Sequence, residues 1–285
     1  MDECSVNGVT VKYTSAGSGL PLVMLHGWGA DHRLAERMIE PAFAHRSGWR
    51  RIYPDLPGMG CSAPAQSIRS HDDMLAVVEG FIDSLAGSER FVVGGVSYGG
   101  YLAQGLVQHM GDRIDGLLLV VPSVERDRAR QHFPPHEVRI VEPAFAENLT
   151  HDEKWLTDTI VVQTMSVLDQ VREELLPALG IANPEFLQRL GRENSLSFDV
   201  RSPARPFTAP TLVLAGRQDS VTGYREALTL IEHYPHGTFA VLDSAGHMLH
   251  REQQAVFRSL VSEWVDRVEI GRNGGRVPDR HGKTR

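Results

Sequence analysis

Short apolar runs alternate with amphipathic stretches before residue 122 and again after residue 207. In the stretch 71–85, apolar residues recur three and four positions apart, which is the spacing of one buried helix face. Regular alternation of strand and helix predicts an α/β protein with a mostly parallel, twisted sheet and helices on both faces. We expect strands at 9–13, 22–25, 51–54, 91–94, 117–121, 211–216 and 238–242, and helices near 33–45, 71–85, 101–107 and 252–268.

The alternation stops between Pro122 and Phe207. This stretch has helical periodicity only, and prolines divide it into helices expected near 137–148, 152–179 and 184–193. It is inserted after a core strand, where loops open onto the catalytic face of such sheets, so it predicts a helical cap over a substrate pocket. The expected divisions are a core built from 1–122 and 207–268, a cap at 123–206, and a flexible basic tail at 269–285.

The segment Gly95–Gly99 has the pattern G-x-S-x-G, with Ser97 at its centre. It follows the apolar run 91–94 and precedes a helical stretch, which is the context of a nucleophile elbow. Glycines suit this turn because the chain reverses tightly and holds the serine in a strained backbone conformation. The pattern therefore indicates that Ser97 is a nucleophile.

A serine hydroxyl needs an adjacent base, usually a histidine that a carboxylate orients. In this architecture the acid and then the histidine follow the serine along the chain. Asp219 follows the expected strand 211–216, and His247 follows the expected strand 238–242. Loops after parallel strands gather at one edge of the sheet, so we predict that Asp219 and His247 complete a triad with Ser97.

An oxyanion hole needs a second backbone amide from an earlier loop. The sequence His26–Gly29, directly after the expected strand 22–25, is suited to supply it. With this segment included, the chain resembles the serine-dependent α/β-hydrolases of the esterase and lipase-like group that carry an HGxG loop. The resemblance covers roughly residues 6–121 and 207–267. It rests on four segments: His26–Gly29, Asp55–Ser62, Gly95–Gly100, and Gly246–His247 followed five residues later by Glu252.

The resemblance implies that Ser97 is the nucleophile, Asp219 the acid and His247 the base. It also implies an oxyanion hole formed by the backbone amides of Trp28 and Tyr98. The helical insertion corresponds to the cap of this family. No metal or organic cofactor is implied by the resemblance, and no ligand spacing or nucleotide-binding glycine motif appears in the sequence.

Other residues compete for these roles. The resemblance gives His26 a structural role that braces the oxyanion loop. Asp55 precedes a Pro-Gly turn and is expected to bond turn amides. Asp243 is the rival acid, and Asp219 is favoured over it because its position after a strand matches the acid position that the resemblance implies. His250 is expected to face solvent or the cap, and surface positions are expected for His71, His109, His132, His136, His151, His233 and His236.

Composition narrows the setting. The net charge of −7 argues against nucleic acid as a partner. Only two cysteines are present, Cys4 in an expected tail and Cys61 in a glycine-rich turn, which favours a reducing, cytoplasmic location. We expect no secretory signal, because the first residues lack a basic segment followed by an apolar one. We expect no contact with a membrane, because no apolar run approaches the ~18 residues of a spanning helix. A monomer or a homodimer is expected.

The predicted function is hydrolysis of a small to medium, largely apolar carboxylic ester through an acyl-enzyme. Three alternatives use the same triad: a carbon–carbon bond hydrolase acting on a meta-cleavage product, a lactonase, and a cofactor-free haloperoxidase. The sequence Trp28-Gly29-Ala30, where carbon–carbon hydrolases of this family carry a Pro-Gly-rich loop, ranks the ester first. A binding protein without turnover is a further alternative. The expected substrate contacts are Trp28, Tyr98, Trp155, Met165 and Met248.

Overall fold

An eight-stranded sheet forms the centre of the computed structural model, which describes residues 1–124, 133–193, 195–203 and 205–274. The strand order is β1-β2-β4-β3-β5-β6-β9-β10; β1–β2 and β2–β4 pair antiparallel, and all other neighbours pair parallel. The mostly parallel sheet is therefore confirmed. The strands are β1 (Asp2–Val6), β2 (Val9–Gly17), β3 (Leu20–Leu25), β4 (Trp49–Pro54), β5 (Phe91–Val96), β6 (Ile114–Val120), β9 (Thr211–Gly216) and β10 (Gly237–Leu242).

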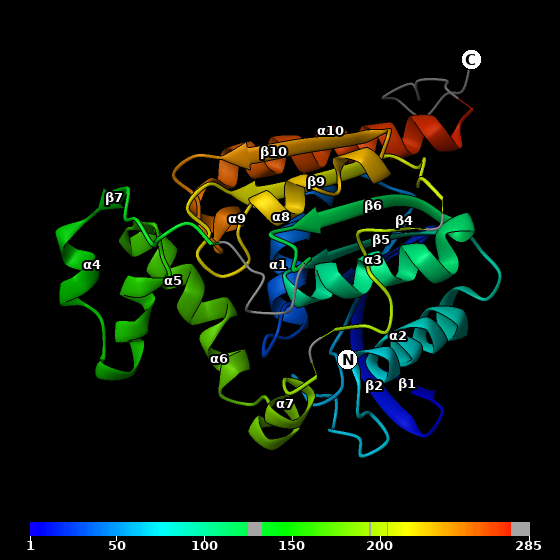
Figure 1. Ribbon diagram of the computed structural model, residues 1–285, viewed down its shortest axis with the longest axis horizontal. Helices are drawn as coiled ribbons and strands as arrows, with labels where there is room; N and C mark the ends of the chain where they lie inside the picture. Colours follow the sequence, from blue (N-terminus) through cyan, green and yellow to red (C-terminus); the bar gives the residue numbers. More distant parts are fainter. Residues whose placement is uncertain (125–132, 194, 204, 275–285) are drawn as a thin grey trace.

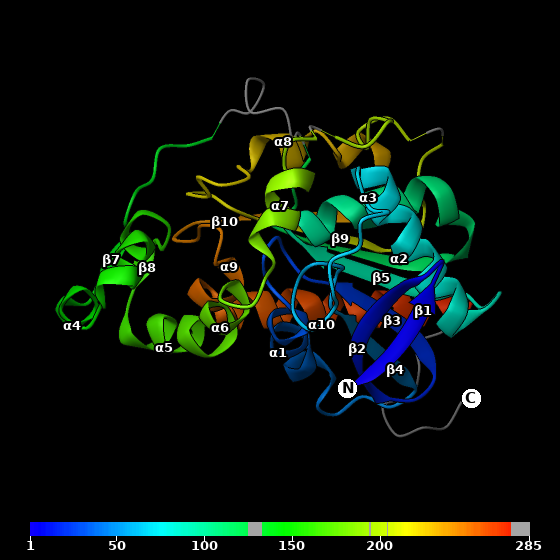
Figure 2. The same ribbon diagram turned by 90° about the horizontal axis from the view of Figure 1, so that it is seen from below.

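Helices cover both faces of this sheet (Figure 2). Side chains of β3 alternate between the two faces: Val23 and Leu25 pack with α2 and α3, whereas Leu22 and Met24 pack with α1 and α10. All four are at most 1% exposed, as expected for strands buried on both sides. The helices around the sheet are α1 (His32–Phe43), α2 (His71–Ala86), α3 (Tyr98–Met110), α8 (Arg225–Leu228), α9 (Leu249–Glu252) and α10 (Gln254–Arg272), with short 3-10 turns η1 (Gly111–Arg113) and η3 (Ile231–His233).

Residues 123–206, which we call the inserted segment, connect β6 to β9. Its described elements are β7 (Ile140–Val141), α4 (Pro143–Glu147), η2 (His151–Asp158), β8 (Val162–Gln163), α5 (Met165–Glu174), α6 (Leu176–Leu179) and α7 (Pro184–Leu190). Helices α4, α5 and α6 lie beyond the carboxyl ends of the central strands (Figure 1). The segment thus stands at the edge of the sheet where Ser97, Asp219 and His247 are carried.

The expectation that the inserted segment contains helices only is wrong. β7 and β8 form a small parallel pair, and the expected helix 152–179 is divided into η2, β8, α5 and α6. The division falls on the run Thr159–Val162, which is made of β-branched residues that favour extended backbone over helix. The expected helix 137–148 is likewise replaced by β7 followed by the short α4, which begins at Pro143.

The two termini also differ from expectation. Cys4 lies in β1, which pairs with β2, and not in a tail. The last helix is interrupted at Gln253 (φ −126°, ψ 47°), and α10 then continues to Arg272, past the expected end at 268. Its buried face of Phe257, Val261 and Trp264 ends at Val268, and the last four residues of the helix are not buried. His132 and the tail residues 275–285 lie outside the described residues.

Candidate active site

Ser97 stands at a sharp turn between β5 and α3. Its backbone is in a left-handed conformation (φ 52°, ψ −113°) that residues other than glycine adopt at a cost in energy. The turn is secured because Ser97 N–H donates to Val120 O (3.0 Å) and Ser97 O accepts from the N–H groups of Tyr101 and Ser123, both at 3.1 Å. The serine side chain is thus carried at the carboxyl end of the central strand.

The glycines beside Ser97 are required by close backbone approach. A Cβ atom on Gly95 would lie 2.2 Å from the carbonyl carbon of Gly99, and one on Gly99 would lie 2.3 Å from Leu25 O. Neither distance is compatible with a side chain. The physical reason inferred for the G-x-S-x-G pattern therefore agrees with the packing of the turn.

Asp219 and His247 are in contact. Asp219 Oδ2 lies 3.0 Å from His247 Nδ1, and Asp219 is fully buried. Its Oδ1 also accepts the N–H groups of Val221 (2.8 Å) and Thr222 (3.1 Å). Burial by itself raises the pKa of the Asp219 carboxyl, but His247 and these N–H donors outweigh it and leave that pKa below its ordinary value. Asp219 is therefore a carboxylate at neutral pH and can accept a hydrogen bond from a protonated His247 Nδ1.

The competing aspartates make other contacts. Asp243 has a side chain 64% exposed, and its carboxylate accepts from Gln218 Nε2 (2.7 Å). Asp55 is buried and accepts from Cys61 N–H (2.7 Å) and His32 N–H (2.7 Å), as expected for a residue that holds a turn. The geometry therefore favours Asp219 over both.

Three side chains hold the turn that carries His247. Gln218 Oε1 accepts Ala245 N–H (3.2 Å), and Gln253 Nε2 donates to Ser244 O (3.0 Å). Glu252 Oε2 accepts Gly246 N–H at 2.6 Å. Sequence reasoning missed these roles for Gln218 and Gln253, because long-range contacts of amides leave no pattern along the chain.

His26 braces the loop that follows β3. Its Nε2 accepts Leu56 N–H (2.9 Å) and its Nδ1 lies 2.7 Å from Gly27 O, so the tautomer with a proton on Nδ1 satisfies both contacts. Burial lowers the pKa of His26, which keeps the ring neutral. A Cβ on Gly27 would lie 3.5 Å from Ser97 Cβ, so this loop runs directly beside the serine.

An aromatic cluster lies next to that loop. The rings of Trp28 and Tyr98 meet edge to face, with centroids 5.0 Å apart. His71 was expected at the surface, but it is fully buried, and its Nδ1 lies 2.9 Å from Tyr98 Oη. Its position at the start of α2, a helix that packs under the inserted segment, explains the burial: His71 Nε2 lies 3.1 Å from Glu193 O.

The inserted segment approaches this region from two sides. Near the loop that follows β3, a Cβ on Gly29 would lie 3.2 Å from Leu179 Cδ2, and one on Gly191 would lie 3.6 Å from Trp28 Cζ2. Near the histidine turn, a Cβ on Gly246 would lie 2.8 Å from Val161 Cγ2. Leu179 and Val161 were not named from the sequence, because a helix or strand inside an insertion gives no indication of its contact partners.

The expected substrate contacts are placed unevenly. Met248 is buried, with Arg251 Nη1 3.0 Å from its sulfur. Met165 begins α5 and is partly buried, whereas Trp155 is 40% exposed. Trp28 and Tyr98 flank the loop beside Ser97. A role in substrate binding stays a prediction for all five.

The residues after His247 carry unusual buried charge. Arg251 Nε donates to Glu174 Oε2 (3.0 Å), which joins α9 to α5, and the Arg251 side chain is 1% exposed. His250 was expected to face solvent or the cap, but it is 5% exposed and packs against Phe257. Burial lowers the pKa of His250 well below its ordinary value of 6.5.

One group of residues has the chemistry of metal ligands. Ligand atoms of Asp31, His32 and Asp55 lie within 4.8 Å of one another, a grouping that the sequence did not reveal. Each already has a partner, because Asp31 caps α1 and pairs with Arg33, while His32 Nδ1 lies 2.8 Å from Asp55 Oδ1. The cluster therefore holds the start of α1 against the Asp55 turn.

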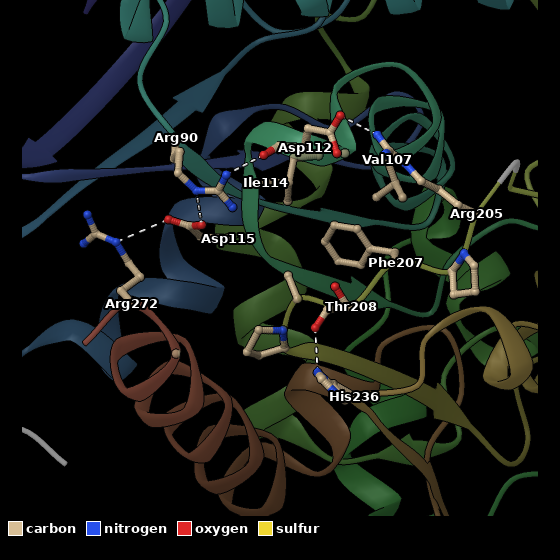
Figure 3. A pocket seen from close by; sticks show the side chains of 15 residues that line it. Arg90, Val107, Asp112, Ile114, Asp115, Arg205, Phe207, Thr208, His236 and Arg272 are labelled. Carbon is tan, nitrogen blue, oxygen red and sulfur yellow. Dashed lines mark hydrogen bonds and ion pairs between the residues drawn. The ribbon is translucent and has the colours of Figure 1, made fainter. Parts of the chain in front are cut away.

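A cavity of about 610 Å³ lies at the opposite edge of the sheet, beside the amino ends of β6 and β9 (Figure 3). Arg90, Asp115, Arg205, Phe207, His236 and Arg272 are among its lining residues. Its charged groups pair with each other, as in the contact of Arg272 Nε with Asp115 Oδ2 at 3.3 Å. None of its lining residues belongs to the expected triad. Within the described residues, no helix is long and apolar enough to cross a membrane.

Comparisons with known proteins agree with this architecture. The family model of the alpha/beta hydrolase fold matches residues 21–253. A pimeloyl-(acyl-carrier protein) methyl ester esterase of Legionella pneumophila is 26% identical over 254 residues, covering 87% of this chain and 96% of the relative. A 2-hydroxy-6-oxononadienedioate/2-hydroxy-6-oxononatrienedioate hydrolase of Cupriavidus pinatubonensis is 26% identical over 259 residues, covering 88% of each.

Among solved structures, an alpha/beta superfamily hydrolase from Oenococcus oeni superposes with a TM-score of 0.85 at 28% identity. The match covers 94% of this chain and 100% of that one. The family model spans well over half of the sequence and includes the Ser97 elbow, Asp219 and His247. The chain therefore belongs to the alpha/beta hydrolase fold family and is an enzyme of that family.

Proposed function

We propose that this enzyme is a serine hydrolase that cleaves a small to medium carboxylic ester through an acyl-enzyme. The observation that carries the proposal is the 3.0 Å contact between Asp219 and His247, made by a fully buried carboxylate at the same edge of the sheet as the strained Ser97 turn. A buried, oriented acid on a histidine is the second half of a triad, and the elbow supplies the first.

In the proposed reaction, His247 takes the hydroxyl proton of Ser97 while Ser97 Oγ attacks the ester carbonyl. Asp219 fixes the imidazole tautomer and stabilises its positive charge. His247 then gives the proton to the departing alcohol, which leaves Ser97 acylated. Water, deprotonated by His247, attacks the acyl-enzyme and releases the acid.

The negative charge on the carbonyl oxygen is held, in this proposal, by the backbone N–H groups of Trp28 and Tyr98. The loop of Trp28 runs beside Ser97, as the 3.5 Å approach at Gly27 indicates, and Tyr98 directly follows the nucleophile. Loss of one such donor commonly costs about 3–4 kcal/mol of transition-state stabilisation.

The substrate class follows from the surroundings of the triad. We propose that the inserted segment acts as a cap, because Leu179 and Val161 reach the oxyanion loop and the histidine turn. These contacts are apolar and favour an apolar acyl group. The methyl ester esterase of Legionella pneumophila supports an ester as substrate. Free Cys4 and Cys61 support a cytoplasmic location.

A carbon–carbon bond hydrolase is the second candidate. The oxononadienedioate hydrolase of Cupriavidus pinatubonensis has the same 26% identity as the esterase, so relatedness does not separate the two. Both reactions can use the same serine, histidine and aspartate.

A fluorophosphonate probe tests the shared part of the proposal, because it labels only an activated serine. We expect labelling of Ser97, unaffected by chelators. A panel of p-nitrophenyl esters of increasing acyl length, run beside a meta-cleavage product, then separates the candidates. Turnover of the meta-cleavage product but of no ester would transfer the assignment to carbon–carbon cleavage. The absence of labelling and of both turnovers would refute the proposed mechanism.

A further inference from the structure

One buried carboxylate joins the histidine turn to the inserted segment. Glu252, in α9, is 8% exposed. Its Oε2 accepts Gly246 N–H (2.6 Å), and its Oε1 accepts the N–H groups of Val161 (2.7 Å) and Val162 (3.3 Å). Gly246 directly precedes His247, whereas Val161 and Val162 belong to the inserted segment. A single side chain therefore bonds backbone on both sides of the boundary.

The two oxygens of Glu252 accept hydrogen bonds from different partners, so both contacts require the ionised carboxylate. A carboxylate accepts hydrogen bonds at both oxygens, whereas an amide accepts at one and presents donors at the other. Each N–H bond to a buried carboxylate is charge-assisted, and an N–H group left without an acceptor in the interior destabilises the folded state. Isosteric replacement by glutamine would thus break the link at one end and keep the shape.

Packing ties the same two backbones together. A Cβ on Gly246 would lie 2.8 Å from Val161 Cγ2 and 3.4 Å from Thr159 O, so the histidine turn lies directly against the inserted segment. The adjacent Arg251 makes a second connection, because its guanidinium pairs with Glu174 of α5. Arg251 and Glu252, which are successive residues of α9, therefore both contact the inserted segment, and Glu252 also holds the turn that carries His247.

We infer that Glu252 is a positioning residue that links the placement of His247 to the docking of the inserted segment. When the segment is docked, Val161 and Val162 hold one oxygen of Glu252, and the other oxygen fixes Gly246 and with it the imidazole. When the segment moves away, the histidine turn loses one of its supports. This inference rests on the proposed function, since it takes His247 as the base.

The variant Glu252→Gln tests the link, with Glu142→Gln as the matched control. Glu142 also accepts a backbone N–H, that of Met165 at 2.8 Å, but both residues lie within the inserted segment. We expect kcat for a short p-nitrophenyl ester to fall about 10- to 100-fold in Glu252→Gln with KM changed less than about threefold, because the base is misplaced and binding is not. Glu142→Gln should keep kcat within about twofold.

Hydrogen exchange of backbone amides gives a readout that does not depend on activity. In Glu252→Gln the amides of Gly246 and Val161 should exchange at least about tenfold faster than in the parent, and in Glu142→Gln they should not. If Glu252→Gln does not fold, Glu252→Asp replaces it, because aspartate keeps the charge but is too short to reach both backbones.

Two results would overturn the inference: a folded Glu252 variant with kcat within twofold of the parent, or unchanged exchange at both Gly246 and Val161. Failure of the proposed function is a separate result. In that case the parent protein itself would not be labelled by the probe and would hydrolyse no substrate, while the exchange experiment would still decide whether Glu252 links the two backbones.

Discussion

Among the charged groups at the two edges of the central sheet are pairs that differ strongly in exposure. At the carboxyl ends of the strands, Asp219 is fully buried, and the side chain of Arg251 is 1% exposed against Glu174. At the amino ends, the side chains of the Arg205–Asp112 pair are 70% and 78% exposed, beside an open cavity of about 610 Å³. An exposed ion pair therefore stands beside the cavity at the amino edge, whereas a buried carboxylate and a buried ion pair stand at the edge that carries Ser97.

This difference in exposure supports the proposed site at the carboxyl edge. Burying a charge is unfavourable unless partners are held in place, so a fully buried carboxylate on a histidine requires a preformed environment. Loops after parallel strands meet at their carboxyl ends, which supplies that environment at one edge only. Ion pairs in contact with water need no such support and contribute little.

Replacing Ser97 with alanine should have the largest effect on activity. Without the hydroxyl no acyl-enzyme forms, and turnover should fall by several orders of magnitude, as it does when the nucleophile of the serine protease subtilisin is removed. The left-handed backbone at Ser97 does not depend on the hydroxyl, so thermal stability should stay near that of the parent. Ester kinetics and a melting curve measure both. A folded Ser97→Ala protein with most of its activity would remove Ser97 from the mechanism.

Asp219→Asn should have the next largest effect. An asparagine can present its NH₂ group to His247 Nδ1 and so stabilise the wrong tautomer. The equivalent substitution in a serine protease lowers kcat about 10⁴-fold. The rival Asp243→Asn should stay within about threefold of the parent, because Asp243 faces solvent and bonds Gln218. Rates measured side by side decide between the two acids. Equal losses in both variants would contradict the assignment of Asp219.

The buried pair at the carboxyl edge should affect stability more than activity. Glu174→Gln leaves the buried Arg251 guanidinium without its anion, and breaking a buried pair by removing one partner costs about 3–5 kcal/mol. The neighbouring Glu173→Gln is the matched control, because Glu173 pairs with Arg37 at the surface, with side chains 67% and 46% exposed. Urea unfolding of both variants measures the difference. Similar midpoints would show that burial does not distinguish the two pairs.

Stability should also depend on pH through buried histidines. Burial lowers the pKa of His26 and of His250 from 6.5, so just below pH 6.5 the unfolded chain binds more protons than the folded one. The two histidines therefore contribute stability to the fold above pH 6.5, and this stability is lost as pH falls from 6.5 through their lowered pKa values in the folded protein. The raised pKa of Glu252, caused mainly by burial, acts in the opposite direction.

His250→Phe isolates one of these contributions. Neither ring nitrogen of His250 has a hydrogen-bond partner within the described part of the chain, and the ring packs against Phe257. Phenylalanine should fit this site, and the melting temperature of the variant should fall less between pH 7 and pH 5 than that of the parent. Since His26 and Glu252 are common to both proteins, the difference reports His250. Parallel curves would exclude it as a source of acid sensitivity.

The features that could be predicted depend on residues close together in the sequence. The strands around Ser97, Asp219 and His247 were predicted because apolar runs and glycine turns are contiguous in sequence, and the contact of Asp219 with His247 follows from the shared edge of a parallel sheet. The small β7–β8 pair was missed because two-residue strands leave too short a signal. The run of β-branched residues at 159–162 was its only trace.

Burial that depends on distant partners could not be predicted. His71 occurs among polar neighbours in the sequence, but Tyr98 and the inserted segment enclose it. His250 packs against Phe257 of α10, which its sequence position does not reveal. Glu252 was noted for its spacing from His247, but its bonds to Val161 and Val162 cross 91 and 90 residues. Such contacts depend on how the inserted segment docks, which sequence periodicity does not encode.

The smallest effect is expected for a substitution at the amino edge of the sheet, which tests whether the exposed charges there matter for activity. Asp112→Asn removes the anion that pairs with Arg205, but both side chains are mostly in water, where solvation replaces the lost attraction. The melting temperature should shift by less than about 2 °C, and kcat/KM for the preferred ester should be unchanged. Activity is the more informative measurement, because the cavity beside Asp112 lies at the amino ends of β6 and β9, whereas Ser97 follows the carboxyl end of β5. A fall of more than about fivefold in kcat/KM, with the fold intact, would mean that the two edges are coupled and that the exposed charges take part in the working of the enzyme.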